Sequence, residues 1–216
     1  MIRSLAQTLL GASCAVCGAA GPSPCVACAT RLRPAGPVRP CPTGLTSCTA
    51  VLRYEGAGRD LITALKYRNH HVALDRLAGA AAERASATVG PIDLVTWPPT
   101  TAGRRRQRGY DQAELVARAV AAHLGRPARA TMRRRPGPPQ TGRDAAARRG
   151  GPRFTAPRRP ARHLTGARVL LVDDVVTTGA TFTAAARLLR HLGAQEVHGL
   201  ALARTPSPHA VAPADG

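Results

Sequence analysis

The sequence predicts an α/β protein in which helices flank a parallel β-sheet, with a small four-cysteine zinc ribbon at its N-terminal end. Apolar strands alternate with amphipathic helices from residue 49 onward, and such alternation indicates a parallel sheet with right-handed crossovers. The aliphatic run 169–172 leads into two acids and a Thr/Gly turn, as in a buried strand that ends at a binding loop. Four cysteines within residues 14–28 form two Cys-x2-Cys pairs.

The length and composition of the chain suit a protein made of three consecutive segments. The 216 residues suffice for one ordinary domain and a small appendage. We expect an N-terminal helix, the zinc ribbon and a linker over 1–48, the α/β domain over 49–204, and a disordered tail over 205–216. No stretch approaches the length of a membrane span, so membrane insertion is not expected, and we expect a cytoplasmic protein.

The cysteine pairs are spaced as a small zinc ribbon requires. Four thiolates around one tetrahedral Zn2+ are expected, from Cys14, Cys17, Cys25 and Cys28. Disulfides would not persist in a reducing cytoplasm, which removes the main alternative. A module of this size has almost no core, so the metal would supply its folding free energy and serve a structural role.

The segments around the ribbon are less regular. A short amphipathic helix over 1–14 is expected to lead into it, and the Pro- and Arg-rich stretch 31–42 predicts the linker that follows. Cys41 and Cys48 have the wrong spacing for a metal knuckle, so we interpret them as unpaired cysteines near a domain boundary.

The first half of the α/β domain contains two strands and two helices. Residues 50–55 read as a strand, Gly56-Ala57-Gly58 as a turn, and 59–67 as a helix with three apolar residues on one face. An alanine-rich helix is expected at 75–87. The strand 93–97 is stopped by Pro98-Pro99, because proline cannot donate to a sheet ladder.

The second half begins with an arginine-rich loop at 103–108. A helix is expected over 111–124, where apolar residues recur at helical spacing, and a short strand over 128–132. Residues 133–160 are basic, rich in Pro and Gly, and expected to be irregular. After the central strand, apolar positions from Phe182 to Leu192 predict a helix that stops at Gly193, and 197–203 predicts the last strand.

The turn after the central strand has the features of a phosphate site. The N–H groups of Thr178 to Thr181 have no helical partner and, with the helix dipole, form a seat for an anion. Gly179 permits close approach of the phosphate to the backbone. Asp173 and Asp174 are acceptors suited to two sugar hydroxyls, so a ribose 5-phosphate is indicated.

Three other interpretations of this segment are weaker. It can be an ordinary strand followed by a capping acid and a helix. A receiver domain also places an acid pair after an aliphatic strand, but near the start of the domain and without a Thr-Thr-Gly-Ala-Thr loop. A P-loop or Rossmann enzyme is close to excluded, because no Gly-x4-Gly-Lys occurs and Lys66 is the only lysine.

Residues 169–181 closely resemble the 5-phosphoribosyl-1-pyrophosphate (PRPP) motif of the type I phosphoribosyltransferases. The resemblance implies that Asp173 and Asp174 hold the ribose 2- and 3-hydroxyls. It implies a 5-phosphate loop made of Thr177, Thr178, Gly179, Ala180 and Thr181. It also implies a type I phosphoribosyltransferase-like fold, Mg2+ bound together with PRPP, and a homodimer of the kind that many proteins of this fold form.

Further segments are similar to the ComF family, bacterial phosphoribosyltransferase-like proteins associated with natural competence. The similar segments, in this order behind a Cys-rich N-terminus, are Tyr54-Glu55-Gly56, Leu65-Lys66-Tyr67, Arg108-Gly109-Tyr110-Asp111-Gln112 and Pro139-Gln140-Thr141-Gly142. The family usually has Phe-Asn where this chain has Tyr110-Asp111. As partners, the resemblance implies PRPP, single-stranded DNA and a DNA-uptake helicase.

Transfer from PRPP displaces pyrophosphate through an oxocarbenium-like state, which negative charge on Asp173 and Asp174 would stabilise. We expect the pyrophosphate near Pro99 and Thr100, at the end of the strand 93–97, with Arg108 as the preferred cation. Residues 140–142 lie in a long segment suited to a lid that excludes water.

The charge of the chain leaves two functions open. The net charge is +19, but it is nearly all arginine in a chain crowded with Ala, Gly and Pro, a skew that a GC-rich coding sequence also produces. Aromatic residues are only 3%, so there is little material for stacking nucleic-acid bases. We expect a phosphoribosyltransferase acting on PRPP; the alternative is a non-enzymatic, PRPP-responsive factor that binds single-stranded DNA in transformation.

Overall fold

The fold is described from a computed structural model, which covers residues 13–66, 71–135, 151–157 and 162–206, without the side chains of His71 and Arg108. Within these residues, five strands form one sheet in the order β1-β2-β7-β6-β3. Their bounds are β1 Pro34–Pro37, β2 Ser47–Arg53, β3 Leu94–Thr96, β6 Arg168–Val176 and β7 Glu196–Arg204. Neighbouring strands are parallel except for β1, which pairs antiparallel with β2.

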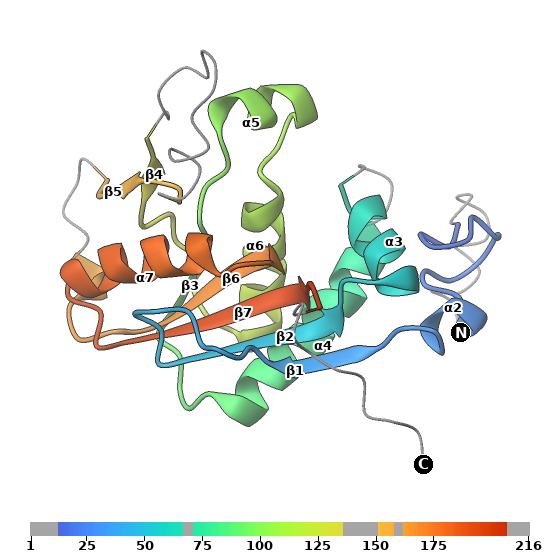
Figure 1. Cartoon of the computed structure of the whole chain (residues 1–216), viewed down its shortest axis with the longest axis horizontal. Helices are drawn as coiled ribbons and strands as arrows, with labels where there is room; N and C mark the ends of the chain where they lie inside the picture. The colour runs from blue at the N-terminus through green and yellow to red at the C-terminus, as the bar shows by residue number, and fades with distance from the viewer. Residues whose placement is uncertain (1–12, 67–70, 136–150, 158–161, 207–216) are drawn as a thin grey trace.

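Helices cover both faces of this sheet (Figure 1). One face carries α3 Gly56–Ala64, α4 His71–Thr88 and α6 Gln112–Leu124, and the other carries α7 Ala180–His191. The short helix α2 Val26–Ala29 lies in the N-terminal module, and α5 Ala102–Arg108 follows β3. A second, two-stranded sheet pairs β4 Arg133–Arg134 with β5 Phe154–Thr155, and the 3-10 helix η2 Arg162–Leu164 precedes β6.

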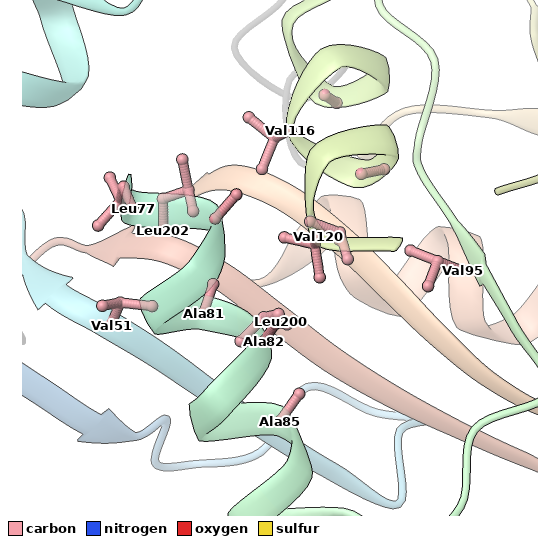
Figure 2. Packing of buried hydrophobic residues seen from close by; sticks show 14 of the residues in the cluster. Val51, Leu77, Ala81, Ala82, Ala85, Val95, Val116, Val120, Leu200 and Leu202 are labelled. Carbon is pink, nitrogen blue, oxygen red and sulfur yellow. The ribbon is translucent and has the colours of Figure 1, made fainter. Parts of the chain in front are cut away.

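The aliphatic run at the start of β6 is fully buried because both of its faces are covered. Leu170 and Val172 pack in the cluster with α4 and α6, whereas Val169 and Leu171 pack in the cluster with α7. Figure 2 shows the first cluster, in which small residues of α4 and valines of α6 face the strands. Each fully buried aliphatic side chain contributes about 1.5–3 kcal/mol, so this strand anchors the domain.

The strand β6 includes the two acids and continues past them. The aliphatic run was expected to lead into the acids before the binding loop, and β6 pairs with β7 as far as Val176, with Asp173 opposite Ala201. The ladder hydrogen bonds continue because β7 runs alongside the full length of β6. The acids are therefore held by a sheet strand rather than by a loop.

Two segments expected to be irregular carry regular structure. Residues 34–37, placed in the linker, form the edge strand β1, where prolines are tolerated because one side of an edge strand needs no ladder bonds. The stretch expected as a loop at 103–108 is the helix α5. Thr101 caps this helix by accepting the Arg104 N–H through Oγ1 at 3.3 Å, and Gly109 ends it in the left-handed conformation.

Three smaller expectations were also wrong. The turn expected at 56–58 is the first turn of α3, which begins at Gly56 with Glu55 as its N-cap. The strand expected at 128–132 is reduced to a single bridge between Ala128 and Val95. The segment 133–160 is not irregular throughout, because β4 and β5 pair across it.

Three expectations lie wholly or mostly outside the described residues: the N-terminal helix, the lid at 140–142 and most of the tail. Of the helices that the structure does describe, none has the length and apolarity needed to cross a membrane.

Candidate functional site

The junction between β6 and α7 presents backbone donors at one end of the sheet. Residues 177–179 connect the two elements, and Gly179 is the N-cap of the twelve-residue helix α7, with φ of +76°. Among the described residues, the N–H groups of Thr178, Gly179 and Thr181 have no hydrogen-bond acceptor. The Ala180 N–H makes only a long contact of 3.4 Å with Thr178 Oγ1. Unpaired donors at a helix N-terminus are suited to bind a phosphate.

The acid pair lies immediately before this loop and is half-buried. The Asp174 N–H donates to Asp173 Oδ1 at 2.8 Å, and the Val175 N–H donates to Asp174 Oδ1 at 2.8 Å. Because an ionised carboxylate offers about four acceptor positions, these local bonds orient both side chains and leave capacity for sugar hydroxyls. This arrangement suits a sugar diol bound at the acid pair and a phosphate bound at the loop that follows it.

The Asp173 carboxyl ionises less readily than an ordinary aspartate does. Burial raises the pKa of the Asp173 carboxyl well above its ordinary value, and the negative charges of Asp174 and Asp111 raise it further. The Asp174 N–H bond opposes this shift without cancelling it. A charge held at such a site costs stability, as expected where a binding role requires it.

This shift predicts a pH-dependent effect of Asp173→Asn on stability. The folded protein holds the Asp173 proton more tightly than the unfolded chain does, so this carboxyl lowers the stability of the fold at neutral pH, where the unfolded chain has released the proton. That penalty shrinks as pH falls through the raised pKa and vanishes below the unfolded value of about 3.9. We expect Asp173→Asn to raise the thermal midpoint by a few degrees at pH 7 and progressively less in acid.

The matched control for this prediction is Asp60→Asn, which changes an exposed carboxylate of α3. Its unfolding midpoint should follow that of the wild type at every pH. A midpoint for Asp173→Asn that falls at pH 7 would contradict the cost assigned to the buried charge.

A third acid, Asp111, ties together the segments expected to meet pyrophosphate. Its Oδ2 accepts the Thr100 N–H at 2.7 Å, and its Oδ1 accepts the Ala113 N–H at 3.2 Å as the N-cap of α6. Burial raises the pKa of the Asp111 carboxyl, and the bonds from these N–H groups oppose that rise. The Thr100 N–H is therefore already engaged, while Pro99 and Thr100 remain half-buried beside it.

The cations near this edge come from two elements. Arg104, Arg105 and Arg106 are exposed on α5, and the side chain of Arg108 lies outside the described part of the structure. Arg134 of β4 is half-buried, with its Cζ 5.9 Å from the centroid of the Phe154 ring. The pKa of the Arg134 guanidinium is lowered, mainly by burial and then by the charge of Arg104. The charges of Asp173 and Asp111 oppose this shift.

Arg134 is thus a cation within electrostatic reach of Asp173 and Asp111 that the sequence did not single out. It lies in a stretch that carries no periodic pattern, and its neighbours in the site are far away along the chain. Lys66 and Tyr110 are brought together as well, because the Tyr110 hydroxyl donates to the Lys66 carbonyl oxygen. This bond joins the end of α3 to the turn between α5 and α6.

The four N-terminal cysteines form a compact cluster. Their Sγ atoms all lie within 4.8 Å of one another, and those of Cys17 and Cys25 are 3.8 Å apart. Four thiolates at about 2.3 Å from a tetrahedral zinc ion would be separated by about 3.8 Å, so the cluster fits such an ion. Cys41 and Cys48 lie outside the cluster as free thiols.

The cluster also has the electrostatics of a cation site. Burial opposes ionisation of Cys14, but N–H groups of Cys25 and Val16 donate to its Sγ at 3.4 Å and help to lower its pKa to about 6. For Cys28, burial and the three neighbouring cysteines raise the pKa to about 12. Four thiolates cannot coexist here without a positive charge among them, and a bound metal ion supplies one.

A mostly parallel sheet flanked by helices, in which an inner strand carries an acid pair and leads through a glycine turn into a helix, has the type I phosphoribosyltransferase fold. Comparison with known families agrees, since residues 111–211 match the family described as Phosphoribosyl transferase domain. The match covers a little under half of the chain and includes β6, the loop and α7. The chain therefore contains a phosphoribosyltransferase domain.

Individual relatives match either a short segment of the sequence or the fold at a low TM-score. The adenine phosphoribosyltransferase of Bordetella avium is 52% identical over 42 residues, which is 19% of this chain and 23% of that enzyme. The purine phosphoribosyltransferase of Pyrococcus horikoshii is 23% identical, with a TM-score of 0.41 over 66% of this chain and 79% of that one. The glutamine PRPP amidotransferase of B. subtilis is 21% identical, with a TM-score of 0.44 over 65% of this chain and 30% of that one.

These likenesses are limited in what they imply. The chain spans less than a quarter of the length of the adenine phosphoribosyltransferase it matches, so that enzyme's base specificity does not transfer. The structural likenesses are too loose to carry an inference about ligand or activity.

Proposed function

We propose that the protein binds PRPP at the carboxyl end of β6 and transfers its 5-phosphoribosyl group. One observation carries this proposal: at the N-terminus of α7, three N–H groups have no acceptor within the described part of the chain, and a half-buried pair of carboxylates lies just before them. A phosphate bound to a helix N-terminus and a diol bound to carboxylates are the two fixed ends of a ribose 5-phosphate.

In this proposal Asp173 and Asp174 accept hydrogen bonds from the ribose hydroxyls. Their negative charge also stabilises the cation that develops at C1 as the bond to pyrophosphate breaks. Five residues form the 5-phosphate loop: Thr177, Thr178, Gly179, Ala180 and Thr181. Pro99, Thr100 and Arg108 border the pyrophosphate, and Arg134 adds positive charge near the acid pair.

Two metals belong to the proposal. Mg2+, bound with PRPP, would neutralise charge on the leaving pyrophosphate, and the oxygen ligands that it prefers are those of PRPP and of carboxylates. Zn2+ would be held by Cys14, Cys17, Cys25 and Cys28 in a structural role, because four protein ligands leave no position for water.

From the resemblance to the ComF family we infer a role in natural competence and DNA uptake in the cytoplasm, with a DNA-uptake helicase as a partner and a homodimer as the assembly. The alternative is a PRPP-responsive factor that binds single-stranded DNA without catalysis. It is favoured by exposed arginines on two neighbouring projections, α5 and the β4–β5 sheet (Figure 1): Arg104, Arg105, Arg106, Arg133, Arg135 and Arg153.

One experiment separates these two functions. Pyrophosphate release from PRPP is measured against a panel of nucleobases and single-stranded DNA, and DNA binding is measured as a function of salt. Release with one acceptor identifies the transferase. Salt-dependent DNA binding without release supports the alternative, provided that Arg104→Gln, Arg105→Gln and Arg106→Gln together weaken it and reduce the salt slope. Arg59→Gln with Arg76→Gln, which changes exposed arginines on α3 and α4, is the control.

A further inference from the structure

The segment between β1 and β2 lies against the phosphate loop and the helix that follows it. We call residues 38–46 the brace. They lie outside the span that matches the phosphoribosyltransferase family, yet Val38, Cys41 and Leu45 pack against the hydrophobic cluster that contains α7. The brace therefore contacts the candidate site from a part of the chain that precedes the matched span.

The contact between the brace and the loop is made by Pro42 and Gly179. A Cβ atom on Gly179 would lie 2.8 Å from Pro42 Cγ and 3.2 Å from Pro42 Cβ. The buried Pro42 ring thus fills the space that a side chain at position 179 would need. Gly179 is required here twice, once for this close approach and once for its φ of +76°.

The brace is fixed to the sheet and to α7 immediately after this contact, at residues 44–46. Arg190 of α7 donates through Nε to the Gly44 carbonyl at 3.3 Å and through Nη2 to Thr46 Oγ1 at 2.8 Å. The Thr46 N–H donates to the Val197 carbonyl of β7 at 2.8 Å. Leu45 packs closely on Gly199, where an added Cβ would lie 2.7 Å from Leu45 Cδ1. A segment tied at these points cannot shift without disturbing Pro42.

We propose that Pro42 is a positioning residue for the phosphate loop. The ring holds Gly179 in place, and Gly179 in turn aims the N–H groups of Thr178 to Thr181 at one point. Donors that are already aligned bind an anion more tightly, because less conformational entropy is lost on binding. The ligand in question is the 5-phosphate of a ribose phosphate, so the proposal rests on the proposed function.

The test compares Pro42→Ala with Pro91→Ala. The control removes an exposed proline just before β3, at the opposite edge of the sheet, so both variants share the greater freedom that proline loss gives the unfolded chain. Two quantities are measured: hydrogen exchange of the peptide 174–184 without ligand, and the affinity for ribose 5-phosphate. We expect Pro42→Ala to speed exchange of the Thr183 amide, which is bonded to the Gly179 carbonyl at the start of α7, about fivefold and to weaken affinity about fivefold, equivalent to about 1 kcal/mol. Pro91→Ala should change neither.

A second variant keeps the inference testable if Pro42→Ala folds poorly. Arg190→Gln loosens the brace without altering Pro42, and its effect on affinity should not add to that of Pro42→Ala, since both act through one segment. Unchanged loop exchange in both variants would overturn the inference. If the wild type fails to bind ribose 5-phosphate while Pro42→Ala still speeds exchange, the proposed function fails and the bracing role stands.

Discussion

Replacing Asp173 and Asp174 together with asparagine is expected to weaken PRPP binding about a hundredfold in the presence of Mg2+. Each carboxylate would lose the extra strength of a hydrogen bond to a charged acceptor, worth about 1.5 kcal/mol, and about 3 kcal/mol in all is a hundredfold in affinity. The change keeps side-chain size and the bonds that each residue accepts from the backbone. Calorimetric titration of PRPP into both proteins measures it.

The loss of binding should not be accompanied by a loss of stability. Removing a half-buried charge at position 173 is expected to stabilise the fold at neutral pH, so weakened binding cannot be attributed to unfolding. Asp60→Asn, which alters an exposed acid of α3, should bind as the wild type does. Affinity that survives the double substitution would remove the acid pair from the site.

Cys14→Ser combined with Cys25→Ser is expected to abolish zinc binding and to unfold the N-terminal module. The four Sγ atoms lie close enough to share one ion, and a zinc site of this type supplies about 10–16 kcal/mol to a small module at neutral pH. Loss of two ligands leaves a site that cannot complete a tetrahedron. Elemental analysis of the purified protein measures the metal, and limited proteolysis of residues 13–33 reports the unfolding.

Cys41→Ser is the matched control, because Cys41 is a free thiol outside the cluster. It should retain the full metal content and the protease resistance of the wild type. If zinc persists in the double variant, or if the wild type contains none, the four-cysteine cluster is not the zinc ligand set.

The periodic part of the sequence predicted the central elements well. The run 169–172 lies in β6, the apolar spacing after Thr181 gave the position of α7, and 197–203 lies in β7. These elements are set by burial on both faces of a parallel sheet, and burial leaves a strong hydrophobic pattern. The cysteine spacing predicted a cluster whose sulfur atoms the structure does bring together.

Other features depend on contacts that leave no local pattern. The helix α5 is arginine-rich and exposed, so its sequence lacks an apolar face, and only the Thr101 cap and Gly109 mark its ends. Asp111 could be recognised as an acid before a helix, but its bond to Thr100 joins two segments that no periodicity relates. The electrostatic effect of Asp173 on Arg134 and the contact of Pro42 with Gly179 arise only from the tertiary fold.

The most direct test of the account is calorimetric titration of PRPP into the full chain with Mg2+. We expect saturable binding of one PRPP per chain that ribose 5-phosphate displaces, because both ligands would occupy the same acid pair and phosphate loop. Absence of binding under these conditions would contradict the central claim and would mean that the β6–α7 junction is retained as a scaffold alone.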